Sequence, residues 1–148
     1  MPYTYKYPRP MVTVDIAIFC KFDDGLKVLL IQRGNPPFKN AWALPGGFIE
    51  MNEKVVDSAY RELEEETGLT GVILDQFETY GDPGRDPRGR TISVVYSGFT
   101  TAENAAVKGA DDARQATWVS IEGIPELAFD HSKILADLIK LIRELSDS

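Results

Sequence analysis

The amino-acid sequence predicts a single domain of the α/β (α+β) class, in which helices cover a β-sheet. Three observations support this prediction: several short apolar segments with the composition of strands, an amphipathic helix in the middle of the chain, and a second helix with an apolar stripe near its end. The 148 residues fit one domain, spanning residues 1–148, that can bury a hydrophobic core. Hydrophobic residues make up 43% of the chain, which argues against disorder.

Five segments are predicted to form strands. The first two, residues 12–22 and 26–32, flank the sequence Asp23-Asp24-Gly25, which is typical of a hairpin turn. The other three cover residues 72–80, 91–99 and 116–121. Residues 81–90 are so rich in glycine and proline that a loop is expected there.

The central helix is predicted from apolar residues that recur at the spacing of one helix face: Val55, Val56, Ala59, Tyr60 and Leu63. Asn52 is expected to cap its start, and Gly68 to end it in the left-handed conformation that glycine adopts without strain. A second helix is predicted over residues 132–145, with the stripe Ile134, Leu135, Leu138, Leu141, Ile142 and Leu145.

Three glutamates of the central helix, Glu62, Glu65 and Glu66, stand at i, i+3 and i+4 and so share one face. Because like charges at this spacing repel one another, the cluster stabilises the helix only when a cation lies between them. Carboxylate oxygens suit hard divalent ions such as Mg²⁺ or Mn²⁺. The alternative is a solvated acidic face, which most acidic runs on helices form.

Neighbouring residues favour the metal site over the solvated face. The tight loop 44–47 contains two glycines, which let backbone carbonyls approach an ion closely. Glu53 lies on the loop side of the helix start, and Arg61 places a cation within the anionic group. The planar fork of Arg61 is expected to brace the carboxylates rather than to contact substrate.

Composition and charge exclude other classes of function. A net charge of −7 disfavours nucleic-acid binding, which requires a broad cationic surface. No apolar run approaches the length of a membrane span, and residues 1–8 lack the apolar stretch of a signal peptide. Cys20 is the single cysteine and lies in an apolar run, so a core position is expected and not a disulfide. Together these features favour a cytoplasmic protein that does not associate with membranes.

The segment from Gly47 to Leu69 is similar to the signature of the Nudix hydrolases, G-x5-E-x7-R-E-U-x-E-E-x-G-U, at every specified position. The resemblance implies the Nudix fold, an α/β/α sandwich around a mixed sheet with a loop-helix-loop catalytic motif. It also implies hydrolysis of a nucleoside diphosphate linked to another moiety. Glu62, Glu65 and Glu66 fall on the family's metal-binding glutamates, and the carbonyl of Gly46 falls on a backbone ligand. Glu53 and Arg61 fall on the structural pair at the helix start.

The remaining segments look like those of bacterial and archaeal ADP-ribose pyrophosphatases, which implies cleavage of ADP-ribose to AMP and ribose 5-phosphate. The likeness rests on residues 81–88, on the approach from Phe38 to Gly47, and on residues 109–113 and 128–131. The expected substrate contacts are Arg33, Phe38, Arg85, Arg88, Arg90 and Asp112. The alternative for the three arginines of residues 85–90 is an exposed loop in which they contact no substrate. His131 has two alternatives, substrate contact or local hydrogen bonds, and the second is the commoner role of a histidine beside a helix start. The general base remains open between a motif glutamate, with Glu62 preferred, and a later acid such as Asp112.

Three further expectations follow from this branch. One alternative function is a house-cleaning hydrolase of oxidised or non-standard nucleoside triphosphates, whose motif is the same. Another is a non-catalytic module that senses ADP-ribose, as in Nudix-derived repressors, but the complete set of motif glutamates argues against a DNA-binding role. Tyr3, Tyr5 and Tyr7 precede the first strand, and such aromatic residues either lie at an interface, where they are enriched, or fold back over their own domain. The resemblance to ADP-ribose pyrophosphatases, which are commonly dimers, implies a symmetric homodimer.

Overall fold

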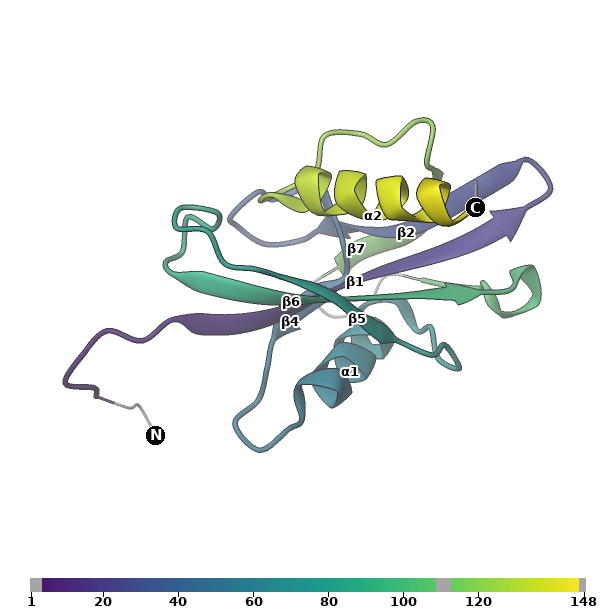
Figure 1. Ribbon diagram of the computed structural model, residues 1–148. Helices are drawn as coiled ribbons and strands as arrows, with labels where there is room; N and C mark the ends of the chain where they lie inside the picture. Colours follow the sequence, from purple (N-terminus) through teal and green to yellow (C-terminus); the bar gives the residue numbers. More distant parts are fainter. Residues whose placement is uncertain (1–3, 109–112, 147–148) are drawn as a thin grey trace.

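Two helices lie on opposite faces of one twisted sheet (Figure 1). The computed structural model describes residues 4–108 and 113–146, so Tyr3 and Asp112 lie outside the described residues. The elements are β1 (Met11–Phe22), β2 (Gly25–Arg33), β3 (Trp42–Ala43), β4 (Gly46–Phe48), α1 (Val55–Thr67), β5 (Asp75–Tyr80), β6 (Thr91–Thr100), the short 3-10 helix η1 (Ala102–Asn104), β7 (Ala113–Ser120) and α2 (His131–Ser146). The predicted α/β/α sandwich is confirmed.

The sheet is mixed, with β1 at its centre. Its main strand order is β3-β2-β1-β6-β5, while β4 pairs with β1 and β7 pairs with β2. β1 runs parallel to β6 from Met11 opposite Thr91 to Cys20 opposite Thr100, and the other pairings are antiparallel. The β1–β2 hairpin closes at Gly25, whose φ of 127° is allowed for glycine but strained for residues with a side chain.

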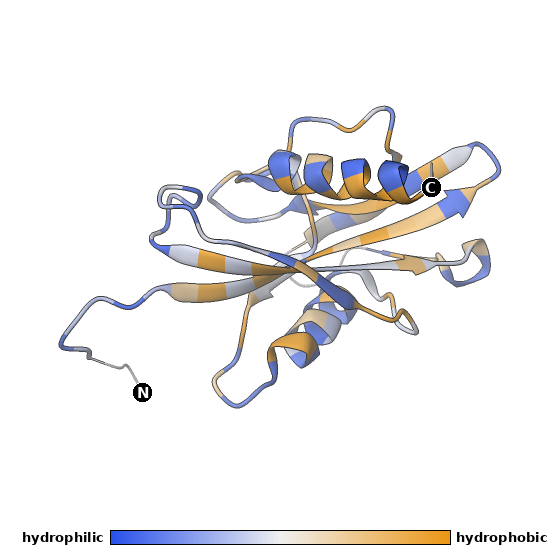
Figure 2. Cartoon of the chain, viewed as in Figure 1, coloured by the Kyte–Doolittle hydropathy of each residue, from blue (hydrophilic) through white to orange (hydrophobic). Residues whose placement is uncertain are grey.

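The two faces of β1 pack into two separate parts of the hydrophobic core. Because successive side chains of a strand point to opposite faces, Ala17 and Phe19 pack with α2, while Ile16 and Ile18 pack with α1. All four are fully buried. The apolar side of α2 faces the sheet, as Figure 2 shows, and its core residues are Ile134, Leu135, Leu138, Ile139 and Ile142. Leu141 and Leu145 of the predicted stripe are exposed instead.

Several predicted boundaries are wrong for identifiable reasons. The strand predicted over residues 72–80 is β5, which begins at Asp75. The amide of Leu74 donates to the hydroxyl of Tyr60 (2.9 Å) instead of pairing with a neighbouring strand. The last strand begins at Ala113 and not at residue 116, because Ala113 pairs with Arg33 beyond a shift in the register of β2 and β7. The two short strands β3 and β4 were not predicted; each pairs with a long strand and carries little pattern of its own.

The ends of α1 test the two capping predictions. Asn52 is not the cap: the N-cap residue is Lys54, and it forms no side-chain capping bond. Gly68 ends the helix as predicted, with a φ of 76° and its amide donating to the carbonyl of Glu64.

Cys20 is buried in β1, and burial raises the pKa of its thiol. Among the described residues, no helix is long and apolar enough to span a membrane.

Candidate active site

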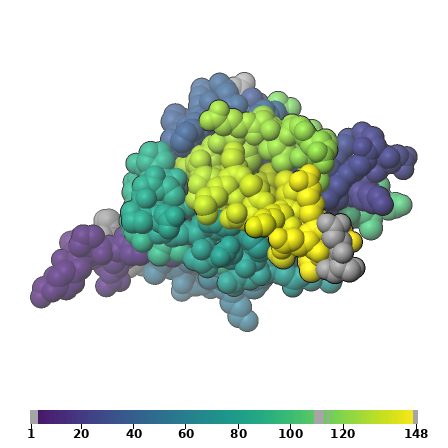
Figure 3. Space-filling model, turned by 45° about the horizontal axis from the view of Figure 1, so that its top comes forward, coloured from purple at the N-terminus to yellow at the C-terminus, as the bar shows by residue number. Residues whose placement is uncertain are grey.

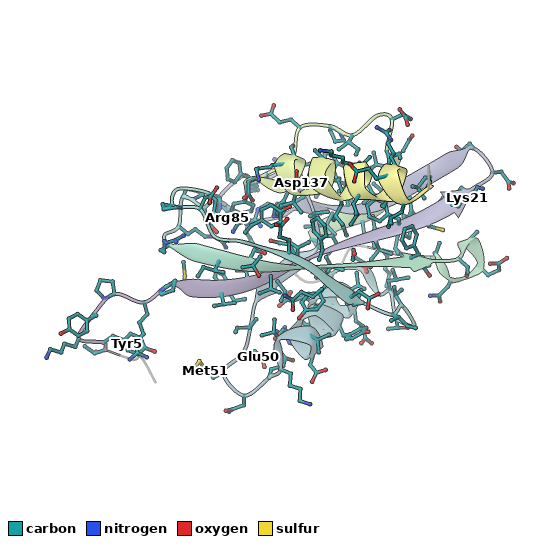
Figure 4. The ribbon with its side chains drawn as sticks, viewed as in Figure 1. Tyr5, Lys21, Glu50, Met51, Arg85 and Asp137 are labelled. Atoms are coloured by element: carbon teal, nitrogen blue, oxygen red, sulfur yellow. The ribbon has the colours of Figure 1, made fainter. Side chains whose placement is uncertain are left out.

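A cavity of about 470 Å³ opens between α1, the loop 44–50, the loop 81–90 and the start of α2. Eight of the residues predicted for the site line it: Arg33, Gly46, Arg61, Glu62, Glu65, Glu66, Arg85 and Arg88. Glu53, Phe38 and Arg90 are not among the lining residues. Figure 4 shows Arg85 beneath the start of α2, with Glu50 in the loop before α1. Folding thus brings the central helix and the distant arginine loop to one cavity.

The acidic face of α1 forms one wall, and Arg61 braces it as predicted. Its Nη1 donates to Glu62 (2.8 Å) and to Glu65 (3.2 Å), while its Nε contacts both oxygens of Glu53 (3.0 and 3.1 Å). Its Nη2 reaches Glu53 and the carbonyl of Phe48. The hydrogen bonds with Glu53, followed by those with Glu62, raise the pKa of Arg61. Hydrogen bonds from Arg61 and then Ser58 hold the pKa of Glu53 below its ordinary value.

In the loop 44–47, Gly46 is required by close approach to the backbone of β1, and Gly47 leaves room for the carboxylate of Glu62. A β-carbon at Gly47 would lie 2.5 to 2.7 Å from the carboxyl atoms of Glu62. A β-carbon at Gly46 would collide with the carbonyl of Val14 and the carboxylate of Asp15. The amide of Gly46 donates to Oε1 of the buried Glu66 (2.7 Å), which fixes the loop against α1. Loop and helix therefore form one rigid unit.

The chemistry of this unit fits a hard divalent cation. Three carboxylates and a nearby backbone carbonyl supply only oxygen ligands, the set that Mg²⁺ and Mn²⁺ prefer. Over residues 4–108 and 113–146, no three acidic, histidine or cysteine side chains already converge as a cage. Glu62 and Glu65 are turned toward Arg61, and Glu66 toward the amide of Gly46. A bound ion would coordinate carboxylate oxygens that now accept hydrogen bonds from the guanidinium of Arg61 and the amide of Gly46.

A buried polar network behind the glycine loop was not predicted. Nδ1 of His131 accepts from the amide of Leu44 (3.0 Å), so its ring proton lies on Nε2, which is 3.4 Å from Oδ1 of Asp15. The hydroxyl of Ser93 donates to the other oxygen of Asp15. Burial raises the pKa of Asp15, but His131, Ser93 and Arg85 outweigh it and leave that pKa below its ordinary value.

The ring of His131 therefore joins residues far apart in the chain, while its backbone amide forms the local bond, to the carbonyl of Ala128 (3.1 Å). The sequence did carry one signal for the network. Asp15 is a lone acid within a strand of apolar residues, and a charge in such a position needs partners.

The three arginines of the loop 81–90 have different roles in the fold. Arg85 forms two bonds to Asp130 (2.6 and 2.8 Å); burial lowers the pKa of Arg85, but Asp130 more than compensates. Arg88 forms a two-pronged pair with the buried Asp86, while Arg90 bonds the carbonyl of Gly81. Burial raises the pKa of Asp86, but Arg88 holds it below its ordinary value.

Two phenylalanines that were not predicted complete the cavity wall. Phe48 follows the glycine loop, and Phe129 precedes α2. The predicted contact Phe38 lies behind Phe129, with ring centroids 4.9 Å apart. Their signal in the sequence is weak, because isolated aromatic residues near loops are common in any globular protein.

Comparison with known proteins agrees with this geometry. The family model of the NUDIX domain matches residues 11–138 of the sequence. The chain is 41% identical to an ADP-ribose pyrophosphatase of Methanocaldococcus jannaschii, over 90% of this chain and 76% of that protein. It is 39% identical to the ADPR responsive transcriptional repressor NtrR of Acinetobacter baylyi, over 87% of this chain and 53% of the repressor, so it spans about half of that relative.

Solved structures show the same fold. The NUDIX domain of Shewanella oneidensis NrtR, complexed with ADP ribose, superimposes with a TM-score of 0.87 at 31% identity, covering 95% of this chain and 94% of that one. A bifunctional NMN adenylyltransferase/ADP ribose pyrophosphatase of Francisella tularensis, complexed with AMP and a manganese ion, gives 0.80 at 29% identity, covering 92% and 43%. With its complete glutamate motif, its sandwich fold and these relatives, the chain belongs to the Nudix family.

Proposed function

We propose that this protein hydrolyses the diphosphate bond of ADP-ribose to give AMP and ribose 5-phosphate. The observation that carries the proposal is one cavity with two unlike walls. The carboxylates of α1 suit divalent ions, and Arg88 lines the same cavity from the loop 81–90. An anionic diphosphate fits between such walls. The names of relatives that cover most of this chain support ADP-ribose as the substrate.

Glu62, Glu65, Glu66 and the carbonyl of Gly46 would hold Mg²⁺ or Mn²⁺. When bound, such an ion neutralises phosphate charge and makes a coordinated water more acidic. Arg61 keeps the carboxylates apart and oriented, since it already bridges Glu62 and Glu65. Glu62 is the preferred acceptor of the proton from the attacking water, with Asp112 as the alternative.

The test is a substrate panel with the full chain. ADP-ribose, other nucleoside diphosphate derivatives and (d)NTPs are each assayed with Mg²⁺, Mn²⁺ or chelator, and products are separated by chromatography. We expect ADP-ribose to have the highest kcat/KM and no reaction in chelator. A clear preference for any (d)NTP would instead support the house-cleaning hydrolase, and full activity in chelator would exclude the metal mechanism.

An ADP-ribose-sensing module is the second candidate, favoured by the 39% identity to the NtrR repressor. A sensor would bind ADP-ribose without turning it over. Calorimetry beside the assay separates the two: tight binding with no AMP formed supports the sensor. The net charge of −7 argues against DNA contact by this domain.

We also infer a symmetric homodimer in the cytoplasm. Residues 4–10 project from the body of the domain (Figure 3), and Tyr7 is 69% exposed. A projecting aromatic segment buries apolar area most readily on a second copy. A buried lone cysteine suits a reducing compartment. Light scattering that gives the mass of two chains supports the dimer, and the mass of one chain overturns it.

A further inference from the structure

The glycine loop that carries the candidate carbonyl ligand is fixed to the sheet on one side. The amide of Ile16 donates to the carbonyl of Pro45 (2.8 Å). The next pair along the two strands is Asp15 with Gly46. Bonded and non-bonded pairs alternate in an antiparallel ladder, so the amide and the carbonyl of Gly46 point away from β1. The amide reaches Glu66 on α1 instead, and the carbonyl is left available to a cation.

On the other side, the ring of His131 holds the same loop two residues earlier. Its Nδ1 accepts from the amide of Leu44 (3.0 Å). Pro45 fixes its own φ and restricts the backbone of the residue before it, so the segment from Leu44 to Gly46 is short and stiff. A displacement of the Leu44 amide is therefore passed on to the carbonyl of Gly46.

Asp15 fixes the ring of His131 and packs against the same glycine. Its Oδ1 lies 3.4 Å from Nε2 of His131. That oxygen would lie only 2.5 Å from a β-carbon at Gly46, so it sits directly against the backbone there. Ser93 holds the other oxygen of Asp15. Since His131 is 4% exposed and Asp15 7%, both contacts are shielded from water.

We propose that His131 is a positioning residue that holds the carbonyl of Gly46 in place as a ligand for the divalent cation. The inference deepens the proposed function, because it rests on the metal site of that function. His131 acts through the amide of Leu44, and Asp15 keeps the ring oriented to accept this bond. Partners behind a metal ligand orient it and raise the affinity for the ion. The bond spans 87 residues, so α2 supports a site whose candidate ligands all lie within residues 46–66.

Two substitutions separate the two nitrogens of the ring. His131→Asn places its side-chain oxygen where Nδ1 lies and keeps an acceptor for the Leu44 amide. His131→Gln places its amide group near Nε2, so it can face Asp15 but leaves the Leu44 amide without its partner. Mn²⁺ is titrated into the full chain of the wild type and of each variant without substrate, and the free ion is measured by electron paramagnetic resonance.

The affinity for Mn²⁺ should distinguish the two variants. We expect His131→Gln to bind Mn²⁺ about ten- to hundredfold more weakly than the wild type, and His131→Asn to stay within about threefold of it. In ADP-ribose hydrolysis, His131→Gln should need more Mn²⁺ for half-maximal rate but recover kcat to within about threefold at saturating Mn²⁺. A general loss of structure would instead lower kcat at every Mn²⁺ concentration.

Ser132→Ala is the matched control at the start of α2. The hydroxyl of Ser132 accepts from the amide of Leu127 (3.1 Å), a local bond, and Ser132 lies outside the cavity. This variant should leave Mn²⁺ affinity unchanged. Urea unfolding shows whether each variant is folded under the titration conditions. If His131→Gln is unfolded, His131→Phe takes its place, because it keeps a ring but offers no acceptor.

Three outcomes would overturn the positioning role: equal Mn²⁺ affinity in His131→Gln and the wild type, an equal loss in His131→Asn and His131→Gln, or an equal loss in Ser132→Ala. Each leaves the proposed function intact, provided that the wild type binds Mn²⁺ and cleaves ADP-ribose. A wild type that binds Mn²⁺ without cleaving ADP-ribose would overturn the function alone, since the titration still tests His131. A wild type that does neither would overturn both proposals.

Discussion

The two walls of the cavity are built in opposite ways. The wall formed by α1 comes from one short stretch, in which the helical repeat alone puts Glu62, Glu65 and Glu66 on one face. The opposite wall joins Asp15, Arg85, Arg88, Phe129 and His131 from three distant segments. The first wall is therefore a local property of the sequence, and the second exists only once the sheet has formed. Changes in the first wall should affect chemistry more than folding, and many changes in the second should do the reverse.

The largest effect is expected from Glu66→Gln. It removes one metal-binding charge while keeping an oxygen that can accept from the amide of Gly46. We expect kcat/KM for ADP-ribose to fall on the order of hundredfold or more, with little change in melting temperature. Glu64→Gln is the matched control, because Glu64 lies on the same helix but is exposed and outside the cavity. Equal activity of the two variants would contradict the metal role.

The second wall should respond chiefly in stability. Arg85→Met leaves Asp130 without the partner that binds it through two bonds, and the Arg85 side chain is only 5% exposed. We expect a loss of about 3 kcal/mol in the free energy of unfolding, measured with urea. Arg143→Met breaks an exposed pair with Glu122 and should cost less than about 1 kcal/mol. A similar cost in both variants would show that burial does not distinguish the pairs.

Arg88 and Arg90 sharpen the comparison within one loop. Arg88 lines the cavity, whereas Arg90 is turned to the carbonyl of Gly81. Arg88→Ala should lower kcat/KM by roughly ten- to hundredfold, the value of a charge-assisted contact, and Arg90→Ala by less than about twofold. The loss in Arg88→Ala should shrink as salt rises, because the wild-type contact is screened. Equal kinetics of both variants and the wild type would leave the loop a simple connector.

The smallest effect concerns Asp15 and pH. Since the pKa of Asp15 is lowered on folding, its ionised form contributes stability above the unfolded value of 3.8, and this contribution is lost as pH falls through the lower folded pKa. The difference in unfolding free energy between the wild type and Asp15→Asn should thus be constant above about pH 5 and shrink below pH 4. Urea titrations at pH 6, 4 and 3 measure it. A difference that grows toward low pH would reverse the sign.

The fold class and the acidic face of α1 were predictable because they depend on periodicity and spacing within single elements, and the sandwich followed from the resemblance to the Nudix hydrolases. Prediction from the sequence failed where a tertiary contact replaced a local one. Asn52 has the right chemistry for a cap, but the helix begins at Val55, and Glu53 is engaged by Ser58 and Arg61. Residues 72–74 have strand composition, but the hydroxyl of Tyr60 accepts from the amide of Leu74.

The second wall could be predicted only in part for the same reason. The arginines of the loop 81–90 stood out by charge, but nothing in the sequence indicated that Asp130 would bind Arg85 and Asp86 would bind Arg88. The pairing of His131 with Leu44 spans 87 residues and follows no repeat. Phe129 owes its place to a left-handed backbone that composition does not reveal.

The hydrogen bond from the Leu44 amide to the His131 ring makes one backbone proton a spectroscopic reporter. Adjacent residues tie the start of α2 to two places, since Asp130 holds Arg85 and His131 holds Leu44. The Leu44 amide proton is bound to an imidazole nitrogen, so we expect its chemical shift to differ from those of amide protons bound to backbone carbonyls. Its exchange with solvent requires the start of α2 to detach from the glycine loop. Hydrogen exchange at Leu44 therefore measures how often the start of α2 separates from the glycine loop, without substrate or turnover.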